Sequence, residues 1–403
     1  METFDFLIDV RDALSKGISR HATACASDVL EDLIDHGCRV LLLAECHQAS
    51  VLAGLSAENS VTLAFAPYNE YFARFDISVL NSINTRFRVR HSHSFAQFLD
   101  PRLGSPSSVS ASIYDLTRLH FGRASLVDDD EFSARLGPRE FENMRQAIDY
   151  LADAVGAPVG DYSSRMEEYI RLHARFVLSR AEFVCVPSRG VIEEIMHYLD
   201  VSDLRNVVIQ GPTRFPSFYE ESKEVRRRRL REFNLPKDFV LFVGTPDWHK
   251  RLDLVLEYLA DGDSGRHDIG KVVVVGDEAG DNLFERLDGY KAREGQIARL
   301  GYVSDEVLRS LYAEAAFTVI PSISEGYCLP LDEALLSGGA VVVSDLPILR
   351  ERVQLAAGRA VAYSPLSASS FWSAIRELPS RSGRSVDVLS RRRSIVSELL
   401  SKI

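Results

Sequence analysis

The sequence predicts an α/β protein of two doubly wound domains, and three observations support this fold class. Short apolar runs rich in Val and Ile alternate with longer segments of helical periodicity along the chain. The runs are continuously apolar, which is typical of parallel strands buried on both faces. At 403 residues the chain is too long for a single hydrophobic core. We therefore expect two Rossmann-like domains, each a parallel sheet covered by helices, facing each other across a cleft.

The expected strands are runs in which β-branched and other apolar residues predominate. They cover residues 4–10, 39–45, 61–67, 110–116, 182–187, 206–210, 239–244, 271–277, 316–322 and 340–344. The intervening segments carry helical signals. Leu252, Val255 and Leu256 have the spacing of a helix with one buried stripe, and Ser188 is expected to cap another helix.

The break between the domains is predicted within 210–237, where Pro residues flank a charged run. We expect an N-terminal α/β domain over 1–209 and a C-terminal one over 210–369. A helical segment over 370–403 is expected to pack back on the first domain. The cluster RRRRLRE inside the break is interpreted as a solvated linker or helix face, with contact to an anionic membrane as the alternative.

Composition excludes several classes of protein. A net charge of -11 argues against nucleic-acid binding, which needs clustered Lys and Arg. No apolar run approaches the roughly 20 residues that span a bilayer, and the first residues lack the basic start of a signal peptide. The five cysteines form no CxxC pair, so we expect reduced thiols and a cytoplasmic protein.

A first chemical signal is FVGTPDWHKRLDLVLEYL, in which an apolar strand ends at Gly244. His249, Lys250 and Arg251 then fall where a helix is expected to begin. The helix dipole disfavours basic residues at that end, so three of them together indicate a bound anion. Solvated surface bases are the alternative interpretation.

A second signal is SEGYCLPLDEALLSGGAVVVSD, with a helix that begins near Pro330 and ends at 337–339. Glu325 lies in the loop before this helix and Glu333 about one turn inside it. Because an ionised carboxylate only accepts hydrogen bonds, hydroxyl groups are suitable partners for both. A molecule with hydroxyls at both ends and a diphosphate between them satisfies both signals, and a nucleotide sugar is such a molecule.

Other cofactor signals are missing from the sequence. No GxGxxG follows an expected strand, and no GxxxxGK[ST] motif occurs. HSHS at 91–94 places two histidines on one side of a strand, without a third metal ligand in view. We expect no metal ion and no cofactor.

These motifs resemble the donor domain of retaining GT-B glycosyltransferases of glycosyltransferase family 4, over about residues 236–365. The resemblance implies transfer of a hexose from a nucleotide-diphosphate sugar to a saccharide or lipid-linked acceptor, in polysaccharide or glycoconjugate biosynthesis at the inner face of the membrane. GDP-mannose is favoured over UDP-sugars.

The resemblance places Glu325 near the donor sugar, Glu333 at the ribose and Lys250 at the diphosphate. A family arginine has no clear counterpart, and His249 and Arg251 are both candidates. The remaining donor-site residues are Gly244, Gly326, Tyr327, Cys328 and Leu329.

The first half resembles the family more thinly and would form the acceptor side. The segment DVRDALSKGISRHATACASDVLEDLIDHG is similar to the family's glycine loop and first helix, which implies phosphate contacts for Gly17 and Arg20. In SIYDLTRLHF, Tyr114 stands where many relatives have a catalytic-region His, and Asp115 follows it. Two alternatives stay open: a nucleotide-sugar epimerase on the same fold, and a non-catalytic nucleotide-binding partner.

Overall fold

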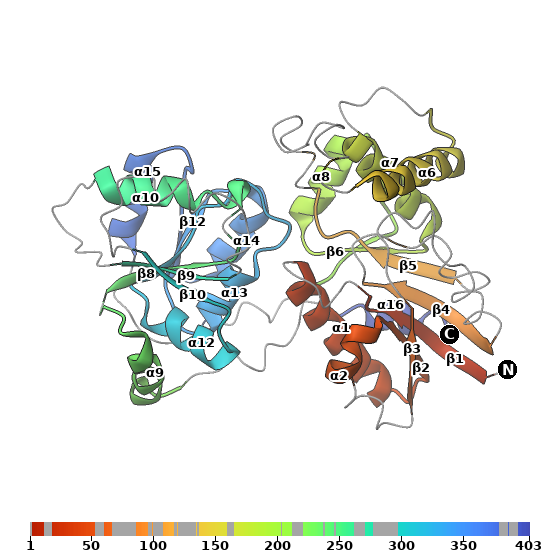
Figure 1. Cartoon of the computed structure of the whole chain (residues 1–403), viewed down its shortest axis with the longest axis horizontal. Helices are drawn as coiled ribbons and strands as arrows, with labels where there is room; N and C mark the ends of the chain where they lie inside the picture. The colour runs from red at the N-terminus through yellow and green to blue at the C-terminus, as the bar shows by residue number, and fades with distance from the viewer. Residues whose placement is uncertain are drawn as a thin grey trace. The chain divides into compact units, whose positions relative to one another are not determined.

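The computed structural model describes two compact α/β units (Figure 1). The described residues are 2–11, 18–52, 60–66, 86–95, 99, 108–116, 119, 134, 137–158, 165–202, 204–211, 221–236, 238–245, 247–261, 271–276, 297–378, 386 and 394–403. The first unit comprises Met1–Thr213 with Arg392–Ile403, and the second comprises Arg214–Arg391.

The strands described in the first unit form one parallel sheet in the order β3-β2-β1-β4-β5-β6-β7. Their bounds are β1 Glu2–Asp9, β2 Val40–Ala44, β3 Val61–Phe65, β4 Phe87–Ser94, β5 Ser108–Ser112, β6 Val184–Val186 and β7 Val207–Ile209. Its helices are α1 Ile18–Asp35, the 3-10 turn η1 Cys46–Gln48, α2 Ala49–Leu52, α6 Pro138–Val155, α7 Arg165–Arg180, α8 Arg189–Leu199 and α16 Val396–Leu400. Apolar residues of α1 and α16 share one core with β1 and β2, while α6 and α7 lie on the other side of the sheet (Figure 1).

The described strands of the second unit also form a parallel sheet, in the order β10-β9-β8-β11-β12-β13. They are β8 Phe239–Val243, β9 Lys271–Val275, β10 Ile297–Gly301, β11 Phe317–Ile320, β12 Val341–Ser344 and β13 Ala360–Tyr363. The helical segments are α9 Lys223–Leu230, η4 Arg231–Phe233, η5 Trp248–Lys250, α10 Leu252–Asp261, α12 Asp305–Glu314, α13 Leu329–Leu336, α14 Pro347–Leu355 and α15 Ala368–Glu377. Helices α10 and α15 share a core on one face of the sheet, and α12 contacts α13 on the other (Figure 1).

The prediction of two doubly wound parallel sheets is confirmed. Ser188 accepts a hydrogen bond from the Val191 N–H as the N-cap of α8, as predicted. Strands β4, β10 and β13 were not among the expected runs, because β4 alternates apolar with basic and polar residues and the other two, IARLG and AVAY, contain a single β-branched residue each.

The C-terminal segment divides between the two units. Helix α15 packs on β12 and β13 of the second unit, where Phe371 is fully buried. Only the last residues join the first unit, where Ile395, Val396 and Leu399 of the α16 region enter its core. The expected boundary at 369 therefore differs from the structure, because the buried face of α15 belongs to the second sheet.

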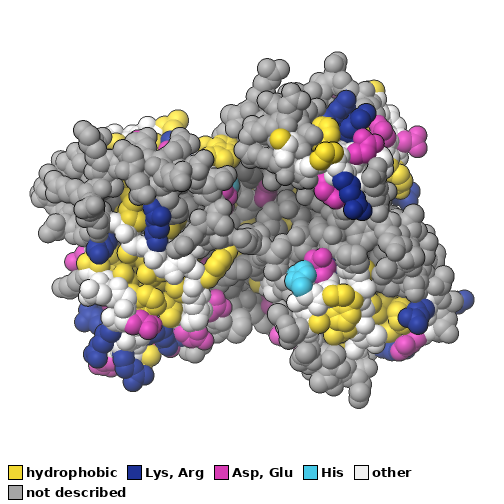
Figure 2. Space-filling view, in the orientation of Figure 1, with side chains coloured by type: hydrophobic (Ala, Val, Ile, Leu, Met, Phe, Trp, Pro, Cys, Tyr) yellow, Lys and Arg dark blue, Asp and Glu magenta, His cyan; other side chains and the backbone are white. Residues whose placement is uncertain are grey.

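The basic cluster of the expected linker forms α9, and its charges divide between two environments. Arg226 pairs with Glu314 of α12, and Arg229 pairs with Glu221 at 2.5 Å. Arg228 and Arg231 are exposed. Figure 2 shows Lys and Arg side chains gathered over this segment, with acidic side chains among them. Arg226 thus attaches α9 to α12, whereas Arg229 pairs with the segment just before α9.

None of the described helices is both long and apolar enough to cross a membrane.

Candidate functional site

The candidate site lies at the carboxyl ends of β8 and β11, which are neighbours in the second sheet. Because parallel strands end at the same edge, the loops that follow them meet there. The loop after β8 contains η5, and the loop after β11 leads into α13. A backbone hydrogen bond of 2.9 Å from the Ile323 N–H to the His249 carbonyl joins the two loops.

This junction brings together Lys250 and Glu325. The ammonium nitrogen of Lys250 lies 2.5 Å from Oε1 of Glu325, and the Ser322 hydroxyl donates to the same oxygen at 2.6 Å. Glu325 is buried and Lys250 half-buried. Burial alone would raise the pKa of Glu325, but the charge and hydrogen bond of Lys250, with smaller help from Ser322 and His249, hold that pKa below its ordinary value. Glu325 is therefore a carboxylate at neutral pH.

The three bases after β8 do not begin a helix, which corrects the dipole argument. His249 and Lys250 lie in the turn η5, and Arg251 adopts a left-handed φ of 48° before α10 begins. The guanidinium of Arg251 pairs with Asp253 at 3.0 Å in the first turn of α10. Lys250 thus pairs with the Glu325 carboxylate of the other loop, while Arg251 pairs with Asp253 of the helix that follows it.

Glu333 lies inside α13, close to the position expected from the sequence. Pro330 lies in the first turn of α13, and the helix ends at Ser337. The Glu333 carboxylate is fully buried, and its Oε2 accepts a hydrogen bond of 2.8 Å from the Tyr312 hydroxyl of α12. Sequence reasoning missed Tyr312, because nothing in the α12 pattern distinguishes it from an ordinary buried aromatic residue.

The loop between Glu325 and α13 contains the other predicted donor-site residues. Gly326 and Leu329 are half-buried, whereas Tyr327 and Cys328 are buried. Burial raises the pKa of the Cys328 thiol, so it stays protonated at neutral pH. At the end of β8, Gly244 has a φ of 136°. A Cβ atom added to Gly276 would lie only 2.5 Å from the Gly244 carbonyl oxygen. The ends of β8 and β9 therefore require glycine at 276.

The predicted residues of the first unit have mixed placements. Gly17 and the side chain of Arg20 lie outside the described residues. Tyr114 is a core residue, and its hydroxyl donates to the Phe95 carbonyl at 2.9 Å. That contact gives Tyr114 a structural role in the first unit. Asp115 follows it and is half-buried.

A buried ion pair that the sequence reasoning missed lies at the end of β1. Asp9 and Arg11 are both fully buried, and Nε of Arg11 donates to Oδ1 of Asp9 at 2.9 Å. The Asp9 carbonyl accepts from the Phe95 N–H at 2.9 Å, so the ends of β1 and β4 are joined. The sequence did contain a signal for this ion pair, because an acidic residue ends an apolar strand and an arginine follows two residues later.

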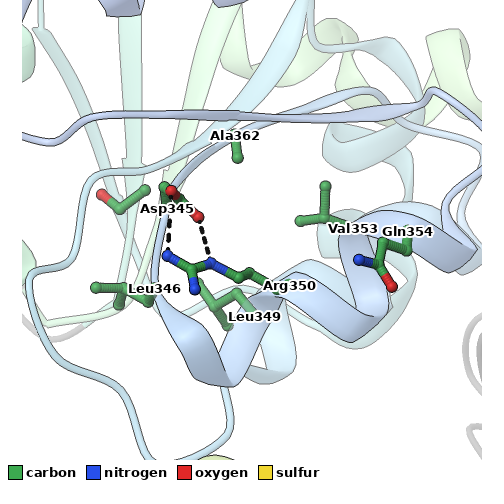
Figure 3. Close-up of a pocket in the computed structure, with 8 residues that line it drawn as sticks. Asp345, Leu346, Leu349, Arg350, Val353, Gln354 and Ala362 are labelled. Carbon is green, nitrogen blue, oxygen red and sulfur yellow. Dashed lines mark hydrogen bonds and ion pairs between the residues drawn. The ribbon is translucent and has the colours of Figure 1, made fainter.

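A pocket of about 150 Å³ lies beside the end of β12, between that strand, β13 and α14 (Figure 3). Leu346, Leu349 and Val353 line it, and the exposed ion pair of Arg350 with Asp345 lies along it at 2.9 Å. The pocket includes none of the predicted site residues. Its two charged side chains, Arg350 and Asp345, are exposed, whereas Glu325 of the Lys250–Glu325 pair is buried.

No group of three or more His, Cys, Asp and Glu side chains suited to a metal ion occurs in the part of the chain that the structure describes.

Comparisons with known proteins give matches in the part of the chain that contains these residues. Residues 225–388 match the family model described as "Glycosyl transferases group 1". The O-antigen chain mannosyltransferase B of Escherichia coli is 45% identical over 73 residues, 18% of this chain and 19% of that protein. The serotype-specific mannosyltransferase WbdA of Escherichia coli is 24% identical over 197 residues, 48% of this chain and 24% of that protein. The chain thus spans about a quarter or less of the length of these relatives.

A solved structure extends the likeness to both units. The crystal structure of Anabaena Alr3699/HepE in complex with UDP-glucose aligns with a TM-score of 0.66 at 14% identity. The alignment covers 99% of this chain and 100% of that one. At this identity the match concerns the fold. The chain therefore has the GT-B fold of two α/β domains, and residues 225–388 of its second unit match the glycosyl transferases group 1 family model.

Proposed function

We propose that this protein is a glycosyltransferase that moves a hexose, with retained anomeric configuration, from a nucleotide-diphosphate sugar to a saccharide or lipid-linked acceptor. The observation that carries the proposal is the meeting of Lys250 and Glu325 at the carboxyl edge of the sheet, with Glu333 on the helix that follows. One buried acid, one base and a second acid match the sugar, diphosphate and ribose of such a donor. The group 1 family match over the same residues supports this assignment.

Each side chain has a role in the proposed reaction. Lys250 exchanges its contact with Glu325 for the diphosphate and stabilises the negative charge that develops on the leaving group. Glu325, released from Lys250, accepts hydrogen bonds from donor-sugar hydroxyls. Glu333 accepts from the ribose, which requires its enclosed carboxylate to be uncovered when the donor binds. The reaction proceeds without a metal ion, because Lys250 supplies the positive charge.

We favour GDP-mannose as the donor. The E. coli relatives that the chain matches in part are named as mannosyltransferases, one of them acting on an O-antigen chain. The Anabaena structure holds UDP-glucose, so a UDP-sugar is the competing donor. By the same reasoning, a growing surface polysaccharide is the favoured acceptor.

Donor competition tests the proposal. GDP-mannose and UDP-glucose would be incubated with the protein and a panel of oligosaccharide acceptors, and the products' anomeric configuration read by nuclear magnetic resonance. We expect an α-mannoside product from GDP-mannose. An isomerised nucleotide sugar without acceptor would instead identify an epimerase. Nucleotide binding without turnover over the whole panel would identify a non-catalytic binding protein.

A further inference from the structure

The backbone that joins Glu325 to α13 has an unusual conformation. Cys328, the N-cap of α13, has a φ of 69° and a ψ of 73°. This left-handed region is disfavoured for a residue with a side chain, so neighbouring groups must hold it in place.

Arg352 of α14 supplies those groups from a distant part of the chain. One guanidinium nitrogen donates to the Cys328 carbonyl at 3.2 Å, and the other donates to the Tyr327 carbonyl. The guanidinium also lies over the Tyr327 ring, 4.5 Å from its centroid. Arg352 is 6% exposed, so these contacts form in the protein interior.

Asp332 completes the arrangement from within α13. Its Oδ2 accepts a hydrogen bond of 2.7 Å from the Tyr327 hydroxyl, and its Oδ1 lies 3.5 Å from the Arg352 guanidinium. Asp332 is fully buried. Arg352 and Asp332 therefore fix both the side chain and the carbonyl of Tyr327.

Fixing two carbonyls also fixes two N–H groups. The C=O and N–H of one planar trans peptide point in opposite directions. Since Arg352 holds the carbonyls of Tyr327 and Cys328, the N–H groups of Cys328 and Leu329 point away from it. These are backbone groups of the same loop that carries Glu325.

We propose that Arg352 and Asp332 are positioning residues that hold the Tyr327–Cys328 backbone in the conformation that receives the donor diphosphate. This inference rests on the proposed function, because it deepens the account of the same donor site. A purely structural role explains the pair poorly: a buried ion pair contributes little net stability compared with apolar residues of similar volume. The Arg352–Asp332 pair is then explained by the single conformation that it imposes on the Tyr327–Cys328 backbone.

Arg359 provides a matched control. It is also a buried arginine of the second unit, 7% exposed, and its guanidinium donates to backbone carbonyls. Those carbonyls belong to Gly338 and Gly339, beyond the opposite end of α13. Arg359→Met thus removes a comparable set of buried hydrogen bonds without touching the loop that follows Glu325.

The experiment compares the parent, Arg352→Met and Arg359→Met by calorimetric titration with GDP, guanosine, UDP and uridine, after circular dichroism has shown that each is folded. We expect Arg352→Met to weaken the diphosphate that the parent prefers by at least about tenfold. Affinity for the matching nucleoside should stay within about twofold, because the nucleoside lacks the groups that this backbone receives. Arg359→Met should leave both affinities near those of the parent.

Each other result has a definite meaning. Equal losses for diphosphate and nucleoside, or an equal effect of Arg359→Met, would overturn the positioning role and leave the proposed function standing. A parent that binds neither GDP nor UDP would overturn the proposed function, and this inference with it. If Arg352→Met does not fold, Arg352→Lys decides, because it keeps the charge beside Asp332 but cannot reach both carbonyls. A folded Arg352→Lys with parental diphosphate affinity would also overturn the inference.

Discussion

Lys250 and Glu325, 75 residues apart in the chain, form a salt bridge of 2.5 Å at the edge of the second sheet. Glu325 is 8% exposed, so its charge depends on the partners the protein provides. The pair is a neutral arrangement of two groups that we assign to adjacent parts of the donor, Lys250 to the diphosphate and Glu325 to the sugar. It also reverses an expectation from the sequence, in which Lys250 was an unfavourable charge at a helix start.

Removing Lys250 should destabilise the donor-free protein. Lys250→Ala leaves the buried Glu325 carboxylate with the Ser322 hydroxyl but without its cation, which should cost about 1–3 kcal/mol of unfolding free energy. Denaturant titration at pH 7 measures the loss. The control is Arg251→Ala, which breaks the neighbouring, more exposed pair with Asp253 and should cost less. A melting temperature that is unchanged or raised in Lys250→Ala would show that the pair contributes nothing.

Acid should reduce this difference between the parent and Lys250→Ala. In the parent, burial opposes ionisation but Lys250 outweighs it, so the pKa of Glu325 lies below the ordinary 4.5. The parent's stabilisation is therefore present above about pH 4.5 and is lost as the pH falls through the lowered pKa. In the variant burial is opposed only by the smaller effects of Ser322 and His249, so the pKa of Glu325 should be higher than in the parent, and protonation then relieves the cost. Unfolding free energies from pH 7 to pH 4 should converge, and a constant gap would contradict the pair's ionisation.

A second pH effect should come from the first unit. Burial lowers the pKa of His91 to about 4 and that of His93 to about 3. Both rings pack near Phe183, and each bonds the Ser110 hydroxyl at 2.7–2.8 Å. Because the unfolded chain takes up protons near pH 6.5, stability should fall as the pH drops below that value. At pH 5 the loss should be about 2 kcal/mol for each histidine.

His93→Asn tests this assignment, since asparagine does not titrate and can still bond Ser110. The variant's unfolding free energy should depend less on pH between 7 and 5 than that of the parent. His36→Asn, at an exposed histidine that follows α1, is the control and should retain the parental dependence. An identical pH dependence in all three proteins would locate the effect elsewhere.

Turnover should not depend on a divalent metal ion. In the proposed reaction the Lys250 ammonium group opposes the diphosphate charge, the task that a divalent cation would otherwise have. Adding EDTA should therefore leave the transfer rate within about twofold of its value without chelator. Loss of activity with EDTA and recovery with Mg²⁺ or Mn²⁺ would reject the metal-free mechanism.

The sequence was informative where local pattern and strand order coincide. Lys250 and Glu325 each follow an apolar strand, and loops after neighbouring parallel strands share an edge, so their proximity could be expected. The GT-B sheets were predictable for the same reason, because buried parallel strands are continuously apolar. Strand β4 was harder to predict, since its basic residues and histidines hide the periodicity.

Contacts between distant side chains could not be predicted in the same way. Arg352 lies 25 residues from Tyr327, and nothing in the α14 pattern indicates that it turns inward. Tyr114 is a second example. Its position in a family motif predicts a place near the transferring sugar, and the contacts that tertiary packing gives it, a ring in the core and a hydroxyl on the Phe95 carbonyl, are not visible in that motif. Burial and partner choice depend on the assembled fold, which periodicity alone does not specify.

The final prediction concerns Glu333 and can be tested from both the protein and the ligand. If its carboxylate accepts the ribose hydroxyls, Glu333→Gln should weaken nucleoside diphosphate binding by about ten- to a hundredfold, the usual worth of hydrogen bonds to a charged group. The fold should tolerate the change, because the amide oxygen can still accept from the Tyr312 hydroxyl that now bonds Oε2. A 2′,3′-dideoxynucleoside diphosphate should bind the parent and the variant equally, since it lacks the hydroxyls in question.

Tyr312→Phe is the control: it removes a neighbour of Glu333 but no proposed ligand contact, so the preference for ribose over dideoxyribose should persist. A parent that binds ribose and dideoxyribose diphosphates alike would show that Glu333 is only a buried partner of Tyr312.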